Sequence, residues 1–279
     1  MNYIEIKSPA KINIGLNILN KRHDGFHNLQ TIFYPLYDLY DLIKIKKSDH
    51  FYFESNNEIL TNDESNLIIK AVKLLEKTTQ RSFNVEIELI KNIPMGAGLG
   101  GGSSNAATVL VSLNEMFKLG IQYDQMIDLA LELGSDVPFF IKSKPSIGFS
   151  RGETLKQIDL DIVKPILIVN PGIHISTKEA FASVEIKQPK LDFNQISVSD
   201  LSDYNYLKKN LTNDFEEFVF SKYPEIGSIK STMYEMGAKY SLMSGSGSTV
   251  YGIFEKVSNA KTALDHFPAD YLKLVVNNN

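Results

Sequence analysis

The sequence contains, between residues 94 and 107, the run Pro94-Met95-Gly96-Ala97-Gly98-Leu99-Gly100-Gly101-Gly102-Ser103-Ser104-Asn105-Ala106-Ala107. Five glycines in the seven positions from 96 to 102 leave many backbone N–H groups uncovered by side chains, so this loop can curl around an anion. Apolar residues then recur at steps of three and four, which predicts an amphipathic helix: Ala106, Leu110, Leu113 and Phe117. The loop therefore delivers its N–H groups to a helix N-terminus, where the helix dipole favours a phosphate.

Three kinds of glycine loop have to be compared. A Walker A loop needs a lysine after its last glycine, and this run has none. The dinucleotide motif G-x-G-x-x-G is matched by Gly96, Gly98 and Gly101, and it stays open as the alternative. It is less favoured because the preceding strand, residues 83–89, alternates apolar and polar residues as an antiparallel strand does. A flexible linker would not run directly into an amphipathic helix.

Composition limits the class of protein. The 279 residues are 43% hydrophobic with a net charge of −4, which predicts a substantial core and no nucleic-acid-binding surface. The absence of cysteine is typical of a reducing compartment. No apolar run approaches the ~20 residues of a membrane helix, and the first residues read as a strand rather than a secretion signal. We therefore expect a cytoplasmic protein that binds neither membranes nor nucleic acids.

Strands followed by helices, with little alternation between them, predict an α+β protein. In the first half we expect strands at 3–7, 12–19, 30–37, 40–46 and 51–54, a helix capped by Ser65, the strand 83–89, and a helix from about Asp124 to Gly134. The pattern restarts beyond residue 152, so we expect domains at 1–152 and 153–279. The second domain should have a strand at 166–169, a polar irregular segment at 186–206, helices at 213–220, 228–236 and 258–267, a hairpin 240–254 and a strand 271–276.

Two charged residues are chemical candidates. Asp136 follows a predicted helix end, on a turn that Pro138 stiffens, so its carboxylate can accept a proton from a hydroxyl; a capping or turn role explains the local pattern as well. Lys11 lies in an apolar strand-like run. If it points inward, it is a buried cation that needs an acidic partner; otherwise it is an exposed strand lysine.

Four segments resemble, in chain order, the motifs of the GHMP kinases, which phosphorylate small metabolites with ATP. They are Ser8-Pro9-Ala10-Lys11-Ile12-Asn13, the glycine loop, Gly134-Ser135-Asp136-Val137-Pro138-Phe139-Phe140, and Met243-Ser244-Gly245-Ser246-Gly247-Ser248-Thr249. The resemblance spans nearly the whole chain. It implies a two-domain fold: an ATP-binding N-terminal domain like domain 2 of ribosomal protein S5, and a ferredoxin-like C-terminal domain that completes the substrate cleft.

The resemblance also assigns catalytic and ATP-binding residues. Lys11 and Asp136 become the catalytic pair, within hydrogen-bond reach of each other, with Lys11 holding Asp136 ionised. ATP is expected to contact Pro94, Met95, Gly96, Ala97, Gly98, Leu99, Gly100, Gly101, Gly102, Ser103, Ser104 and Asn66. Helix capping explains Asn66 almost as well. Mg²⁺ should accompany ATP; its ligands are not identifiable, and Ser103 or Ser104 is the best candidate. Valine at Gly100 or Gly101 should block ATP sterically and leave the fold intact.

The run Asp24-Gly25-Phe26-His27-Asn28-Leu29-Gln30-Thr31 resembles one branch of this family, the isoprenoid-pathway kinase whose substrate carries a cytidine diphosphate. The resemblance implies that Phe26 and Phe181 sandwich the cytosine while His27 reads its edge. The substrate-binding set is then Asn13, Phe26, His27, Thr177, Phe181, Ser244, Gly245, Ser246 and Gly247. The chain departs from the branch in having Phe26 instead of tyrosine, and Ser176 and Lys178 instead of prolines. His23 and His174 are expected at the surface.

Three functions follow, in order. The first is a kinase for a cytidine diphosphate derivative of a small alcohol. The second is a kinase for another alcohol, of the homoserine or mevalonate type, although those substrates would have no use for a cytidine pocket. The third is a non-catalytic nucleotide-binding module, against which the paired Lys11 and Asp136 argue. The expected partners are small molecules, and the protein is expected to be a monomer or homodimer.

Overall fold

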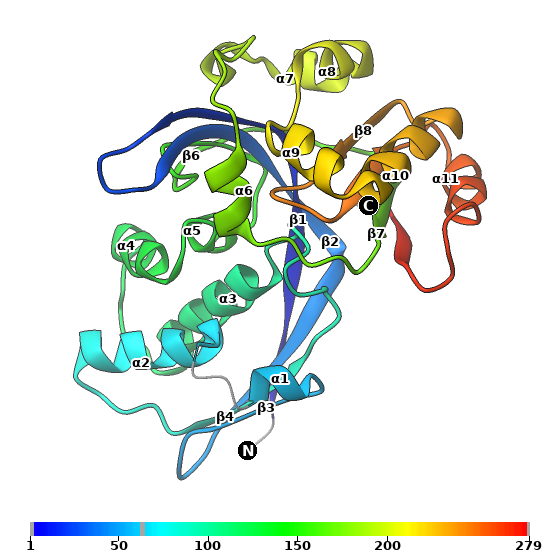
Figure 1. Cartoon of the computed structure of the whole chain (residues 1–279). Helices are drawn as coiled ribbons and strands as arrows, with labels where there is room; N and C mark the ends of the chain where they lie inside the picture. The colour runs from blue at the N-terminus through cyan, green and yellow to red at the C-terminus, as the bar shows by residue number, and fades with distance from the viewer. Residues whose placement is uncertain (1–2, 62–64, 278–279) are drawn as a thin grey trace. The chain divides into compact units, whose positions relative to one another are not determined.

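The structure, a computed structural model, describes residues 3–61 and 65–277, and it divides into two compact units (Figure 1). Unit 1 comprises the described residues within 1–10, 39–95 and 100–143. Unit 2 comprises residues 11–38, 96–99 and the described residues from 144 onward. The chain thus passes between the units several times. The expected domains, 1–152 and 153–279, follow a single cut in the chain and stay a prediction.

Two long strands, β1 (Ile4–Lys21) and β2 (His27–Lys47), pair with each other and contribute residues to both units. The strands expected at 3–7 and 12–19, and at 30–37 and 40–46, were therefore wrongly separated. Pro9 does not end β1. Strand β1 pairs with β2 at an edge of the sheet, where a residue without an N–H group is tolerated.

Unit 1 contains the helix that follows the glycine loop. Its remaining elements are β3 (Tyr52–Ser55), α1 (Glu58–Thr61), α2 (Leu67–Thr79), β4 (Val85–Ile90), α3 (Gly101–Met116), α4 (Tyr123–Leu133) and α5 (Val137–Phe140). Strand β4 pairs antiparallel with residues 42–47 of β2 and parallel with β3. Its alternate residues are buried, and Ala106, Leu110 and Leu113 of α3 are fully buried, as their spacing predicted. Helix α3 packs against α2.

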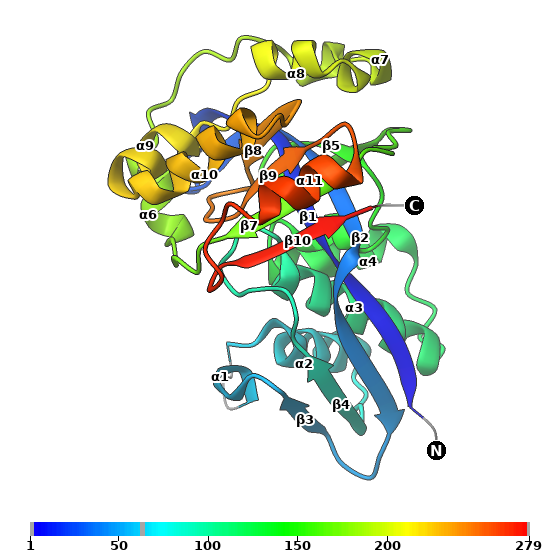
Figure 2. The same ribbon diagram turned by 90° about the vertical axis from the view of Figure 1, so that its right-hand side faces the viewer.

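Unit 2 contains a ferredoxin-like sheet with several additional helices. Its elements are β5 (Ser146–Phe149), β6 (Thr154–Gln157), β7 (Ile166–Asn170), α6 (Thr177–Ser183), the 3-10 helix η1 (Phe193–Gln195), α7 (Val198–Ser202), α8 (Tyr204–Asn210), α9 (Phe215–Lys222), α10 (Pro224–Glu235), β8 (Tyr240–Met243), β9 (Val250–Ile253), α11 (Val257–Leu264) and β10 (Leu272–Val276). The antiparallel order β10-β7-β9-β8 matches the ferredoxin-like domain that the resemblance implies (Figure 2).

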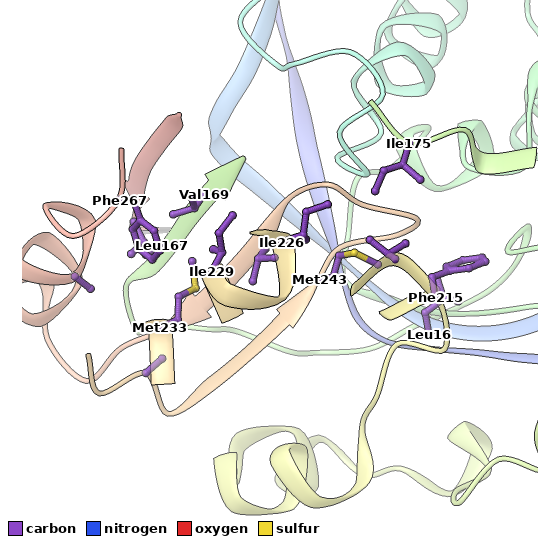
Figure 3. Packing of buried hydrophobic residues seen from close by; sticks show 14 of the residues in the cluster. Leu16, Leu167, Val169, Ile175, Phe215, Ile226, Ile229, Met233, Met243 and Phe267 are labelled. Carbon is purple, nitrogen blue, oxygen red and sulfur yellow. The ribbon is translucent and has the colours of Figure 1, made fainter. Parts of the chain in front are cut away.

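The core of unit 2 forms where α9, α10 and α11 pack on this sheet. Figure 3 shows Leu167 and Val169 of β7 beside Ile226 and Ile229 of α10, and all four side chains are buried. All five residues of β7 are buried, so both of its faces are covered, as its continuous apolar run predicts. The same core continues to Phe215 at the start of α9, which packs edge-on against Phe181 with ring centroids 4.9 Å apart.

The expected irregular segment 186–206 is partly helical, which corrects the sequence prediction. Its short helices have no apolar stripe, but their caps are visible in the sequence. The Ser197 side chain accepts from Asp200 N while the Asp200 side chain accepts from Ser197 N, a capping box. Helix α2 is capped by Asn66 rather than by Ser65. The helix ends elsewhere differ from the predicted ones by a few residues.

Candidate active site

In unit 2, the first part of the glycine loop packs directly on the glycine-serine turn between β8 and β9. A Cβ atom on Gly98 would lie 2.0 Å from the carbonyl oxygen of Ser244, and Gly98 has φ +76°, so only glycine fits there. The Ser244 hydroxyl donates to Gly98 O at 2.9 Å, and Thr249 N donates to Ala97 O at 3.3 Å. Two of the predicted motifs are therefore in main-chain contact.

Lys11 belongs to the same cluster and points inward. It is 3% exposed, and its ammonium donates to Asn13 Oδ1 at 2.6 Å and to Gly98 O at 3.0 Å. Its backbone N–H donates to Leu99 O at 3.0 Å. Of the two orientations considered for the Lys11 side chain, inward or exposed, the structure has the inward one. Oxygen acceptors from Asn13 and Gly98 solvate the buried cation, which would otherwise be costly.

Asn13 is fixed on several sides. Its Nδ2 donates to Thr31 Oγ1 at 2.8 Å, and its backbone N–H donates to the Ser244 hydroxyl at 3.2 Å. The Tyr251 hydroxyl donates to Asn13 O at 3.1 Å. Asn13 is 1% exposed, and its Oδ1 accepts from the Lys11 ammonium. Contact of Asn13 with a substrate stays a prediction.

Asp136, in unit 1, lies between two helices. Helix α4 ends at Leu133 with Gly134 as its C-cap, and Asp136 is the N-cap residue of α5, with Pro138 at the second helical position. Its side chain makes no capping hydrogen bond to α5, so the capping role suggested by the local sequence is not realised. Its carboxylate is half-buried. Because Lys11 and Asp136 belong to different units, their hydrogen-bond contact stays a prediction.

The second part of the glycine loop begins α3 in unit 1. Gly100 is its N-cap in a left-handed conformation with φ +71°, and no side chain caps the helix. The first intrahelical bond runs from Ser104 N to Gly100 O, so the N–H groups of residues 101–103 have no partner within the helix. These three N–H groups are donors that an anion can use.

The two serines of the loop differ in accessibility. The Ser104 hydroxyl is fully buried and accepts from the Ser8 hydroxyl at 2.8 Å, whereas Ser103 is half-exposed. Of the two, Ser103 is therefore the one whose hydroxyl a phosphate or metal ion can reach. Among residues 3–61 and 65–277, no group of three or more His, Cys, Asp or Glu side chains could hold a metal ion.

The expected effect of valine at Gly101 has to be corrected. A Cβ on Gly101 would lie 2.9 Å from Ile93 Cγ2 and 2.9 Å from Lys91 Nζ, so a side chain there would press into the protein rather than toward a ligand. Gly102 is exposed, and the nearest atom to its Cβ would be Leu67 Cδ1 at 3.7 Å. Gly102 is thus the better position for testing steric blockage.

Asn66 acts as a helix cap. Its Oδ1 accepts from Ile68 N at 2.9 Å, and its Nδ2 donates to Leu60 O at 3.2 Å. The capping explanation is confirmed, and contact with adenosine stays a prediction.

The aromatic residues expected to hold the base are arranged differently from the prediction. His27, not Phe26, stacks on Phe181, with ring centroids 5.1 Å apart and an angle of 21° between the planes. Phe26 is 48% exposed, and the Arg151 guanidinium lies 4.0 Å from its ring centroid. A base placed between two rings needs roughly 7 Å between them, the sum of two van der Waals contacts. The rings of His27 and Phe181 are closer than that, so a base could enter only if one of the two rings moved away.

The remaining predicted substrate residues surround the turn between β8 and β9. Thr177, at the start of α6, hydrogen-bonds the Ser246 hydroxyl at 3.1 Å. Gly245 and Gly247 both have positive φ, and a Cβ on Gly245 would lie 3.3 Å from Gly98 Cα. His23 and His174 are exposed as expected, but the His174 ring lies against the loop: a Cβ on Gly96 would be 2.5 Å from its Nδ1.

Sequence reasoning missed Asn213, which supports this turn. The buried Asn213 side chain donates to Met243 O at 2.8 Å and to Gly245 O at 2.7 Å, and it accepts from Phe215 N. The neighbouring Asp214 accepts from Ile18 N at 2.8 Å, which ties the turn to β1. The pair Asn213-Asp214 before an apolar helix is a start signal, but the sequence does not reveal that the amide reaches across to another loop.

Comparison with known protein families gives matches along most of the chain. The model of the GHMP kinases N terminal domain matches residues 66–144, and that of the GHMP kinases C terminal domain matches residues 197–273. A 4-diphosphocytidyl-2-C-methyl-D-erythritol kinase of Bacteroides thetaiotaomicron is 43% identical over 88% of this chain and 90% of its own length. The enzyme of that name from Thermodesulfovibrio yellowstonii is 37% identical over 96% of both chains.

Solved structures give the same result. A crystal structure of 4-(cytidine 5'-diphospho)-2C-methyl-D-erythritol kinase matches 99% of this chain and all of its own, with a TM-score of 0.82 and 30% identity. A homoserine kinase from Cytophaga hutchinsonii matches with a TM-score of 0.73 at 18% identity, a likeness of fold alone. In the described part of the chain no helix is long and apolar enough to cross a membrane.

Gly98→Ala is expected to disrupt the contact between the two loops, because the new Cβ would collide with the Ser244 carbonyl. Gly120→Ala is the matched control: Gly120 has φ +73°, close to the +76° of Gly98, but nothing lies within 4 Å of its Cβ position. Both substitutions share ~1 kcal/mol of backbone strain. In urea unfolding, Gly98→Ala should therefore lower the free energy of unfolding by clearly more than Gly120→Ala does. Equal losses would contradict the close contact.

Burial lowers the pKa of His27 below its ordinary 6.5, and the Lys21 cation lowers it further. The His27 ring therefore binds a proton more readily in the unfolded chain than in the folded one. As the pH falls from 6.5 to the lower pKa of the folded state, the unfolded chain takes up this proton first, and the free energy of unfolding decreases. NMR titration should give a pKa below 6.5, and Phe181→Ala should raise it by exposing the ring. A wild-type value of 6.5 or higher would contradict the prediction.

Proposed function

This chain belongs to the GHMP kinase family, and from that premise we propose that it transfers a phosphoryl group from ATP to the 2-hydroxyl of 4-diphosphocytidyl-2-C-methyl-D-erythritol. The observation that carries the substrate is the identity of 37–43% to curated kinases of that name over about nine-tenths of the chain or more. The segment from Asp24 to Thr31 supports it. The reaction belongs to the non-mevalonate isoprenoid pathway.

In this proposal, ATP phosphates bind the N–H groups at the start of α3. The loop has no lysine, so backbone donors and the helix dipole supply the binding. Mg²⁺ bound with ATP would neutralise phosphate charge, and the half-exposed Ser103 hydroxyl is the candidate ligand from the protein. The buried Asn66 amide is proposed to contact adenosine from the start of α2.

Lys11 and Asp136 are proposed to act on the acceptor hydroxyl. Asp136 accepts the hydroxyl proton as the hydroxyl oxygen attacks the γ-phosphorus of ATP and the bond to the leaving ADP breaks. Lys11 stabilises the carboxylate and the developing negative charge. The contacts of Lys11 with Asn13 and Gly98 support this role, since they fix the ammonium next to the glycine loop. Positioning and charge stabilisation provide most of the catalysis in phosphoryl transfer.

The cytidine is proposed to stack on Phe181, with His27 moving aside to hydrogen-bond the edge of the base. Neutral His27 suits this task, because one ring nitrogen is then a donor and the other an acceptor. Phe26 has no hydroxyl to offer and contacts the base only by its face. Thr177 and residues 244–247 are proposed to contact the rest of the substrate. We expect a cytoplasmic enzyme, monomeric or homodimeric, with no nucleic-acid partner.

The decisive experiment compares acceptors. The purified enzyme with ATP and Mg²⁺ should phosphorylate the cytidine substrate, and it should leave homoserine and mevalonate unchanged. Phe181→Ala should raise the KM for the cytidine substrate roughly ten- to a hundredfold, since stacking contributes about 1–3 kcal/mol per base, with little change in the KM for ATP. Turnover of homoserine or mevalonate would favour the other kinase reading, and ATP binding with no turnover would favour a nucleotide-binding module.

Asp136→Asn is expected to lower kcat by ~10²–10⁴-fold with little change in either KM, because the amide is isosteric but cannot accept the proton. Steady-state kinetics measure the effect. The matched control is Asp124→Asn, at the start of α4 in the same unit, which should leave kcat unchanged. A kcat of Asp136→Asn within about threefold of wild type would exclude Asp136 as the base.

A further inference from the structure

A buried polar network in unit 1 lies directly beneath the start of α3. Asp41 of β2 is fully buried, and its Oδ1 accepts from the backbone N–H groups of Asn92 at 2.7 Å and Ile93 at 2.8 Å. Its Oδ2 accepts from Lys91 Nζ at 2.6 Å and from Asn105 Nδ2 at 2.9 Å. One carboxylate thus joins the segment before the glycine loop to the fifth residue of the helix after it.

The network continues along the helix and up to the loop. Asn105 Nδ2 also donates to the Ser8 hydroxyl at 3.0 Å, and Ser8 donates to the Ser104 hydroxyl. Lys91 Nζ donates to Ile93 O at 2.6 Å as well as to Asp41. Its ammonium and Ile93 occupy the space where a side chain of residue 101 would be, so the main chain of Gly101 lies against Lys91.

The electrostatics of this arrangement are unusual for a structural ion pair. A cation near a helix N-terminus opposes the helix dipole, and burial lowers the pKa of Lys91 although Asp41 favours its charge. Such a pair contributes little to stability compared with well-packed apolar residues. Its distinguishing property is geometry: directional bonds hold the backbone of Asn92 and Ile93 before the loop and the Asn105 side chain after it.

We propose that Asp41, Lys91 and Asn105 are positioning residues that hold the N–H groups of residues 101–103 in the arrangement that binds the ATP phosphates. The inference rests on the proposed function, because it names what the network positions. The three side chains do not contact the nucleotide themselves. They act through Gly101 and the first turn of α3, so their loss should weaken ATP binding more than it weakens binding of the acceptor.

The test uses two asparagines of the same helix. Asn105→Leu removes the hydrogen bonds at the N-terminal end of α3 and keeps the Lys91–Asp41 pair. Asn114→Leu is the matched control, because Asn114 makes two hydrogen bonds to Ile121 near the other end of α3. Calorimetric titration with the non-hydrolysable analogue adenylyl imidodiphosphate, without acceptor, measures nucleotide affinity, and thermal unfolding measures stability.

We expect Asn105→Leu to weaken binding of the analogue by roughly 10- to 100-fold, the usual effect of removing a partner that orients a binding group. Asn114→Leu should lower the melting temperature similarly and leave the affinity within about twofold of wild type. In steady-state assays, Asn105→Leu should raise the KM for ATP and not the KM for the acceptor. Equal affinity in Asn105→Leu and wild type, or equal weakening in the two variants, would overturn the inference.

A second pair of variants tests Lys91. Lys91→Gln can still donate to Asp41 or Ile93, whereas Lys91→Met cannot, so Gln should restore most of the affinity that Met loses. Met and Gln variants with the same affinity would overturn the role of Lys91 as a donor. A wild-type enzyme that does not bind the analogue at all would instead refute the proposed function, so the two failures are distinguishable.

Discussion

The arrangement of unit 2 depends on two stretches of main chain that lie too close for any side chain to fit between them. Gly98 and Ser244 come from segments almost 150 residues apart, and the carbonyl of Gly98 accepts from both Lys11 and the Ser244 hydroxyl. This one oxygen joins the first strand, the glycine loop and the turn between β8 and β9. Asn13 and Asn213 then fix the surroundings, the first by its contacts with Ser244 and Thr31, the second by binding the carbonyls of the turn.

Much of the fold could be predicted from the sequence because its signals are local. The spacing of apolar residues correctly predicted the buried stripe of α3, the alternation in β4 and the hairpin of β8 and β9. The prediction left gaps at residues 8–11 and 38–39, although β1 and β2, which pair with each other, continue through these positions. Propensity describes a residue alone, and the sheet supplies the remaining stabilisation.

The site was less predictable, for a different reason. Glycines are recognisable in a sequence, but the direction in which a Cβ would point is not, so Gly101 was expected to face a ligand when it faces Lys91 and Ile93. The aromatic residues show the same limit. The resemblance assigned Phe26, His27 and Phe181 to the base site, but it could not show that the rings of His27 and Phe181 stack while Phe26 lies against Arg151. Side-chain contacts between distant segments depend on packing that no short motif encodes.

The way the chain alternates between the two units affects how it is made. Unit 1 has all its residues once position 143 has left the ribosome, whereas unit 2 combines residues 11–38 with residues from 144 onward. At synthesis rates of about 5–20 residues per second, the unit 2 portions of β1 and β2 wait on the order of ten seconds for their partners. During synthesis these apolar segments, which include Ile12, Ile14 and Ile18, have no core to enter. The nascent chain therefore exposes these apolar segments through the second half of translation, when aggregation competes with folding.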